Sequence, residues 1–301
     1  MIEQAKSSSG NQLASNVLTI SIVLLAYMFI GQLPLMLAIR FSDVEAVTYG
    51  ESSLQVYAQV FGKNTLLFYL LFPFLTAFIA LIVCMKYIHK KSIRSFFTER
   101  KKFDLKRFFH AFLVWGIVLT LFLSVSLFSS SDLTWNFNWV SFFPLFAIAV
   151  IFIPIQTSFE EFFFRGFLFK LIKNPIQKSW LIVVFTGVVF GLMHGANPEI
   201  EVLGYGILIY YIVTGIFLGL LRLMDDGLEL SMGYHAINNL FGAIVVSNEW
   251  QAFQTDALFI DHAKPSFGWD AILTICFLQP LLLIYFAKKY RWTNWKAKLS
   301  H

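Results

Sequence analysis

Three groups of polar residues interrupt otherwise hydrophobic sequence and could together carry out chemistry. They are Glu160, Glu161 and Arg165; His194; and His235 and Asn239. Charged side chains at membrane depth cost roughly 2.5–3.5 kcal/mol each on insertion scales, so they are usually kept for a function. The three groups therefore predict a catalytic site inside a membrane.

The adjacent carboxylates of Glu160 and Glu161 are expected to have different roles. Neighbouring residues on a helix point about 100° apart, so both cannot face one cavity in the same way. Glu161 and Arg165 are four residues apart and lie on one helix face, which favours an ion pair. Glu160 is then free to act as a general base on water. A structural ion cluster at a helix end would use the same residues.

The two histidine groups suit the same reaction. Phe190 precedes His194 by one helical turn and can wall the same face. His235 and Asn239 are also four residues apart, and two donors aimed at one point suit a developing oxyanion. Each group alone is also typical of hydrogen bonding between membrane helices. Only His194 and His235, of six histidines, fall well inside predicted spans, which favours a single site.

The ordered set of motifs resembles the CPBP (Abi) family of intramembrane proteases, which includes the Rce1-type CAAX-processing endopeptidases. The set is Glu-Glu-x-x-x-Arg, then Phe-x-x-x-His, then His-x-x-x-Asn, each in its own hydrophobic segment. The resemblance implies that Glu160 and His194 activate a water. It also implies that His235 and Asn239 stabilise the oxyanion, with Glu161, Arg165 and Phe190 as supporting residues.

The resemblance leaves a metal as an alternative, because the family is often described as metalloproteases. Glu160, His194 and His235 could ligate zinc, with a water in the fourth position. The chain has no His-Glu-x-x-His motif, and Asn is a poor zinc ligand. We therefore expect glutamate-activated water without a metal.

The composition predicts an all-α polytopic membrane protein with the active site inside the helix bundle. Of 301 residues, 57% are hydrophobic and 14% charged, whereas soluble proteins have about 25% charged residues. Eight segments have the length that crosses a bilayer, about 17–25 residues. They are 17–39, 65–85, 108–128, 142–164, 180–197, 203–221, 232–248 and 269–287.

Three parts of the chain can be distinguished. We expect supporting helices in 1–140, the catalytic core of four spans in 141–250, and a last span with a basic tail in 251–301. Glycines four residues apart, at 187, 191 and 195 and at 215 and 219, predict close helix packing. Cys84 and Cys276 lie in predicted spans and are expected to be buried and unpaired.

The basic residues predict the orientation in the membrane. With eight spans and the N-terminus inside, 20 of the 23 Lys and Arg residues fall on the cytoplasmic side, Lys6 among them. Both termini are therefore expected in the cytoplasm of a multi-pass cell-membrane protein. We expect the cluster in 86–107 to be a solvated loop facing anionic lipid. The charge needs no nucleic acid to explain it.

The helix positions pose a geometric problem. In straight helices at about 1.5 Å per residue, Glu160 and His194 lie ~18 and ~25 Å from the cytoplasmic edge, and His235 only ~8 Å. The three meet only if helices are tilted or broken. We expect a cavity that opens to the cytoplasm.

The function predicted is cleavage of a membrane-associated protein or peptide, as in CAAX-type or bacteriocin- and pheromone-type processing. A transporter or proton relay could use the same buried residues, but no internal repeat supports it. A non-catalytic scaffold or regulator of the same family is the other alternative. No Gly-x-Ser-x-Gly, intramembrane Gly-x-Gly-Asp or P-loop pattern occurs.

Overall fold

The computed structural model describes residues 2–42 and 53–300, so residues 43–52, between the first two predicted spans, lie outside the described residues. The helices of the first half are α1 (Ile2–Leu25), η1 (Ala26–Ile30), α2 (Leu33–Arg40), α3 (Ser53–Phe61), α4 (Lys63–Tyr87), α5 (Arg94–Phe97), α6 (Leu105–Ser129) and α7 (Trp139–Glu161). Those that follow are η3 (Phe162–Leu168), α8 (Phe169–Ile176), α9 (Ser179–Met193), η4 (His194–Ala196), α10 (Glu199–Leu203), α11 (Ile207–Asp225), α12 (Glu229–Ile244), α13 (Trp269–Leu273), η5 (Thr274–Leu278), α14 (Gln279–Tyr290) and α15 (Trp295–Ser300).

Seven helical stretches of the described chain are long and apolar enough to cross a membrane, which confirms the all-α polytopic class. They are Asn11–Arg40, Lys63–Tyr87, Leu105–Ser129, Trp139–Lys173, Ser179–Ala196, Ile207–Asp225 and Trp269–Tyr290. The predicted span 232–248 is not among them. It corresponds to α12, which has only 16 residues. Because α6, α7 and α11 pack around α12, it carries polar residues that a lipid-facing helix could not.

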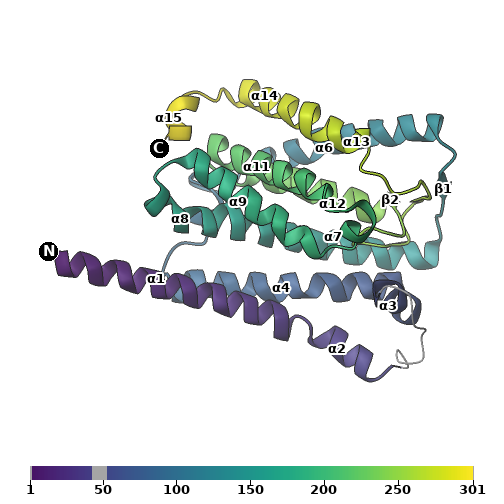
Figure 1. Cartoon of the computed structure of the whole chain (residues 1–301), viewed down its shortest axis with the longest axis horizontal. Coiled ribbons are helices and arrows are strands. Elements are labelled where there is room, and N and C mark those ends of the chain that lie inside the picture. Colours follow the sequence, from purple (N-terminus) through teal and green to yellow (C-terminus); the bar gives the residue numbers. More distant parts are fainter. Residues whose placement is uncertain (1, 43–52, 301) are drawn as a thin grey trace.

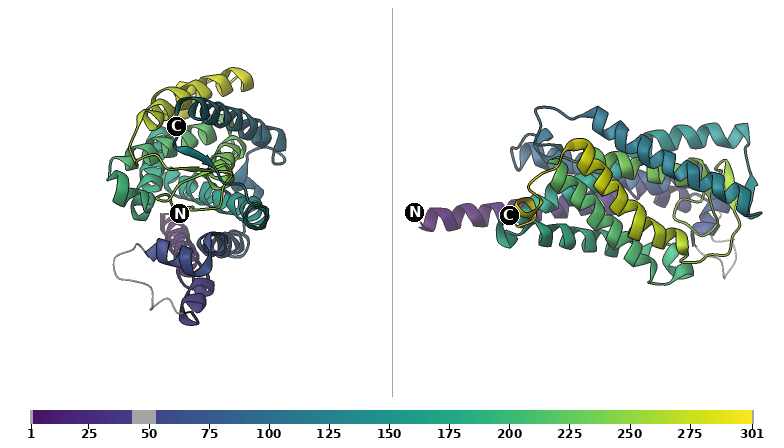
Figure 2. Two further views of the ribbon diagram at one scale, coloured as in Figure 1. Left: turned by 90° about the vertical axis from the view of Figure 1, so that its right-hand side faces the viewer. Right: turned by 90° about the horizontal axis from the view of Figure 1, so that it is seen from above.

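The long helices lie side by side in one bundle, with the N-terminal end of α1 and the C-terminal α15 at the same end (Figures 1 and 2). Three short strands lie at the other end: β1 (Leu133–Trp135), β2 (Val246–Ser247) and β3 (Phe259–Asp261). Their order is β1-β3-β2, with β1 antiparallel and β2 parallel to β3. This small sheet was not predicted, and it ends the seventh predicted span early because Val246 pairs with Phe259.

Most basic residues of the 86–107 segment are exposed, as expected, but Arg100 and Arg107 are partly buried in ion pairs. Arg100 donates to Asp225 at 2.9 Å and to Glu229 at 3.0 Å, and the backbone N–H of Asp104 also donates to Glu229. Glu229 begins α12 and is 0% exposed. The segment therefore covers the turn between α11 and α12, so α12 starts below the protein surface. We call this end of the bundle the basic end.

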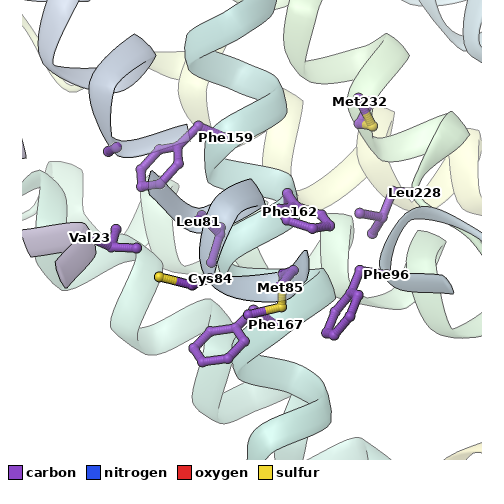
Figure 3. Close-up of a cluster of buried hydrophobic side chains, with 11 residues drawn as sticks. Val23, Leu81, Cys84, Met85, Phe96, Phe159, Phe162, Phe167, Leu228 and Met232 are labelled. Atoms are coloured by element: carbon purple, nitrogen blue, oxygen red, sulfur yellow. The ribbon is translucent and has the colours of Figure 1, made fainter. Parts of the chain in front are cut away.

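An aromatic cluster fixes the rotation of the helix that carries the two glutamates. Phe159 and Phe162 flank Glu160 and Glu161 in sequence and are both buried. Figure 3 shows Phe162 near Phe96 of α5 and Leu228 of the α11–α12 turn, and Phe159 in another part of the same cluster, where its ring lies 6.1 Å from that of Phe74 on α4. The burial of Phe159 and Phe162 leaves the intervening carboxylates on other faces of the helix, toward α12.

The two cysteines lie in different surroundings. Both are free, and Cys84 is buried in the cluster of Figure 3. Cys276 is exposed on η5, so its predicted burial is wrong. An apolar thiol facing lipid meets the same kind of surroundings as one in a core, and therefore sequence alone does not separate the two.

Helices α9 and α11 approach backbone to backbone at their glycines. A Cβ atom on Gly191 would lie 2.7 Å from the backbone nitrogen of Ile212, and one on Gly215 would lie 2.8 Å from the carbonyl oxygen of Gly187. Such distances leave no room for a side chain. Gly195 differs, since nothing lies within 4 Å of a Cβ atom there, and the expected close packing does not extend to it.

We predict that Gly191→Ala destabilises the protein by about 1–3 kcal/mol, the usual range for overpacking, because the backbone of Ile212 would have to shift. Gly195→Ala is the matched control, with an expected effect near zero. Thermal unfolding of the purified variants in detergent measures both. Equal unfolding temperatures for Gly191→Ala and wild type would contradict the close approach of α9 and α11.

Candidate active site

The site is built on the junction between α7 and the π-helical segment η3. The α-helix ends at Glu161, and η3 carries Arg165 in the next turn. Short π-helical segments inside α-helices widen the turn and frequently mark functional sites. This stretch places Gln156, Glu160, Glu161 and Arg165 within ten consecutive positions, and all four side chains are buried.

Glu161 and Arg165 form the ion pair that their spacing predicted. Arg165 donates to Oε1 of Glu161 at 3.0 Å, and both side chains are 0% exposed. The other end of the guanidinium donates to the carbonyl oxygen of Gly215 on α11 at 3.0 Å. The same Oε1 of Glu161 lies 3.0 Å from Nδ1 of His235 on α12. One buried ion pair therefore joins α7, η3, α11 and α12.

The carboxylate of Glu160 lies on the other side of the His235 ring. Its Oε1 accepts a hydrogen bond from Gln156 at 2.7 Å. Its Oε2 lies 3.5 Å from Nε2 of His235 and has no hydrogen-bond partner among the described residues. Glu160 is 7% exposed and His235 is 6% exposed. Glu160 is thus held in place through Oε1, while Oε2 is buried and makes no hydrogen bond within the described part of the chain.

A series of hydrogen bonds holds Glu160 from behind. Trp115 donates to Asn238 at 3.1 Å, Asn238 donates to Asn239 at 3.3 Å, and Asn239 donates to Gln156 at 3.1 Å. An indole N–H can only donate and an ionised carboxylate can only accept, so the two ends fix the orientation of the three amides between them. The structure thereby connects Asn239 to Glu160 through Gln156.

Sequence reasoning missed three members of this series. Gln156 carried a signal, because it precedes Glu160 by one helical turn and is a polar residue in an apolar run. Asn238 stands next to a predicted site residue, and its sequence position did not separate it from Asn239. Trp115 carried no signal, since its role depends on how α6 packs against α12.

His194 ends α9 and lies against the same site from another side. Its Nδ1 donates to the carbonyl oxygen of Phe190 at 2.8 Å, which leaves Nε2 as an acceptor in the neutral ring. Its ring stacks on Tyr211 at 4.3 Å. The described residues show no direct hydrogen bond from His194 to Glu160.

Phe190 stands between the other members of the site. Its ring centroid lies 4.6 Å from that of His194 and 5.9 Å from that of His235, and the guanidinium of Arg165 lies 4.3 Å from the ring. A cation over an aromatic face is attracted to it, most strongly where water is excluded. Phe190 therefore packs against both histidines and Arg165.

The start of α12 explains how His235 can lie level with Glu160 and Glu161, which straight helices starting at the surface would not allow. His235 lies six residues after Glu229, but Glu229 is itself buried beneath Arg100. His235 therefore lies deeper than its distance from a surface loop would place it. In this way it reaches Glu160 and Glu161 without a break in α12.

The alternative ligand set for a metal is not assembled in this geometry. No three His, Cys, Asp or Glu side chains among residues 2–42 and 53–300 are grouped so that they could hold one ion. The Nδ1 contacts of His235 with Glu161 and of His194 with a backbone carbonyl do not bear on this, because metal-binding histidines are held in the same way. The side chains as placed are arranged as a hydrogen-bond network, so we derive no step through a metal.

We predict that Glu161→Gln destabilises the protein by about 3–5 kcal/mol, because it leaves Arg165 charged and buried without its counter-ion. Glu160→Gln is the matched control one residue away. It keeps an oxygen that can accept from Gln156, so its unfolding temperature is expected to stay near that of wild type. Equal unfolding temperatures for the two variants would show that the ion pair does not hold the fold.

Comparison with known proteins agrees with the geometry. Residues 138–241 match the family described as type II CAAX prenyl endopeptidase Rce1-like. The uncharacterized protein YyaK of Bacillus subtilis (strain 168) is 27% identical over 222 residues, which cover 72% of this chain and 71% of that protein. No solved structure matches. The part of the chain that resembles this family, residues 138–241, holds both glutamates and both site histidines.

Proposed function

We propose that this protein is an intramembrane endopeptidase that hydrolyses a peptide bond with a water activated by Glu160. The observation that carries the proposal is the geometry of Glu160: one carboxylate oxygen is fixed by Gln156, and the other makes no hydrogen bond with a described residue but lies within ion-pair distance, 3.5 Å, of Nε2 of His235. Glu161 also has one oxygen without a hydrogen-bond partner, but its other oxygen is shared by Arg165 and His235, whereas that of Glu160 accepts only from the neutral side chain of Gln156. A general base needs one held in place and one open to its substrate.

In the proposed reaction, Oε2 of Glu160 takes a proton from the water while the water oxygen attacks the peptide carbonyl carbon. Nε2 of His194 accepts the second water hydrogen and orients the attack, since Nδ1–H is fixed to the Phe190 carbonyl. The tetrahedral intermediate then collapses with cleavage of the C–N bond. Glu160 returns its proton to the leaving amine, and the two products are a carboxylate and an amine.

His235 and Asn239 would stabilise the oxyanion. When His235 carries protons on both nitrogens, Nδ1 donates to Glu161 and Nε2 is left to donate to the oxyanion. Asn239 uses one N–H for Gln156, and its second N–H is available to the substrate. In this scheme Glu161 and Arg165 are positioning residues, because they act through His235.

The proposed substrate is a membrane-associated peptide or protein, because both glutamates and His194 lie in helices long and apolar enough to span a bilayer. CAAX-type processing and maturation of bacteriocins or peptide pheromones both supply such substrates. We propose a multi-pass cell-membrane protein with both termini in the cytoplasm. The basic end, which carries Arg100 and Lys298, would then face the cytoplasm.

We predict that Glu160→Gln lowers kcat at least 100-fold without unfolding the protein, because general-base catalysis typically contributes 10²–10⁴-fold. Mass spectrometry of peptide termini would compare membranes from cells that produce the wild type with membranes from cells that produce the variant. New termini that appear only with the wild type identify the substrate, and their amounts measure its cleavage. Glu201→Gln, an exposed glutamate on α10, is the control. Unchanged cleavage by folded Glu160→Gln would refute the mechanism.

We also propose that the reaction needs no metal, because Glu160, His194 and His235 are not grouped around one ion. Incubation of the purified enzyme with 1,10-phenanthroline or EDTA should then leave cleavage within about twofold of the untreated rate. Loss of activity on chelation, restored by added zinc but not by magnesium, would instead make Glu160 a ligand or a partner of a metal-bound water.

A further inference from the structure

A cavity of about 390 Å³ lies beside the catalytic network, among α6, α11, α12, α13 and the chain around residue 250. Its lining includes the N-terminal part of α11, whereas the C-terminal end of that helix holds Asp225 at the basic end. The cavity therefore lies toward the other end of the bundle. This differs from the predicted opening at the cytoplasmic side, and neither Glu160 nor His235 lines it.

Two residues of the cavity wall, Glu199 and Trp250, each have a covered polar atom without a normal hydrogen bond, although the side chain of Asn197 lies close enough to Glu199 to stabilise its charge. Oε2 of Glu199 and the indole Nε1 of Trp250 make no hydrogen bond that meets normal distance and angle limits. Glu199 is only 9% exposed, and its other oxygen accepts from the backbone N–H of Ala252 at 2.9 Å. Burial raises the pKa of Glu199. A carboxylate in such a place is stabilised by a cation that donates hydrogen bonds.

The charge and shape of the cavity point to the same ligand. Its described lining has two carboxylates, Glu199 and Asp270, and no Lys, Arg or His. Trp115, Tyr210 and Trp250 add aromatic surface to the walls. Carboxylates combined with aromatic faces recognise ammonium groups, since the negative face of a ring attracts a cation.

We propose that this cavity binds a basic residue of the peptide substrate, with the ammonium group of a lysine side chain or an N-terminal amine against Glu199. This inference rests on the proposed protease function and adds a specificity site to it. A basic residue supplies both missing partners: its ammonium donates to Glu199, and its backbone carbonyl accepts from Trp250. A zwitterionic lipid headgroup would instead bring a phosphate beside two carboxylates, with no basic lining residue to meet it.

The cavity shares two walls with the catalytic network. Asn238 lines it and donates to Asn239, which is bonded to Gln156 and so to Glu160. Tyr211 also lines it and stacks on His194. A peptide held in the cavity would therefore lie against both sides of the site.

Ligand-observed NMR on the purified full-length protein in nanodiscs tests the cation site with Nα-acetyl-lysine amide as the probe. Wild type should bind it, and Glu199→Gln should bind it roughly 10-fold more weakly or worse, the effect expected for a lost charged hydrogen bond. Glutamine keeps an oxygen for the Ala252 N–H, so the variant should fold. Glu201→Gln, the same change on the exposed face of α10, should bind like wild type.

Nα-acetyl-norleucine amide, which has no ammonium, is the matched probe and should bind weakly and equally to all three proteins. Equal affinity for the two probes, or unchanged lysine binding by Glu199→Gln, would overturn the cation site. Glu160→Gln should bind the lysine probe like wild type. Lysine binding without cleavage of any peptide would leave the cation site standing and refute the protease proposal, so the two failures are distinct.

Discussion

The ion pair of Glu161 and Arg165 is the interaction on which the rest of the site depends. Neither side chain reaches water, so each charge is tolerated only while the other is present. Arg165 also binds a carbonyl of α11, and Glu161 also binds His235 of α12. Two charges on adjacent turns thus set the positions of two other helices relative to Glu160. That is why Glu161 is as important to the proposed site as Glu160, the proposed base.

The helices could be predicted from sequence wherever contact with lipid requires an apolar run of residues. An apolar run long enough to cross a bilayer is a strong signal, and seven such runs were predicted close to their observed places. The failures lie where distant segments decide the structure. The run after Ile244 is hydrophobic enough to continue α12, but Val245 and Val246 pair with Phe259 instead. Likewise, Arg100 looks like a solvated loop residue until Asp225 and Glu229 are found beside it.

In the candidate site, contacts between residues close in sequence could be predicted, whereas contacts between separate helices could not. Glu161 and Arg165 meet within one helix, and their spacing alone predicted the pair. The contact of His235 with both glutamates depends on how separate helices are placed, and the sequence indicated only that these residues belong to one site. The support given by Trp115 and Asn238 could not be predicted, because it arises from the packing of α6 on α12. The composition of these positions is that of ordinary membrane helices.

The hydrogen-bond series behind Glu160 has an electrical consequence. All four donors, from Trp115 to Gln156, point toward the carboxylate, so the bond dipoles add head to tail with their positive ends facing the anion. In a medium of low dielectric constant such bonds polarise one another. A change in the charge of Glu160 therefore alters the polarisation of each hydrogen bond in the series, as far as the Trp115 indole, without the movement of any helix.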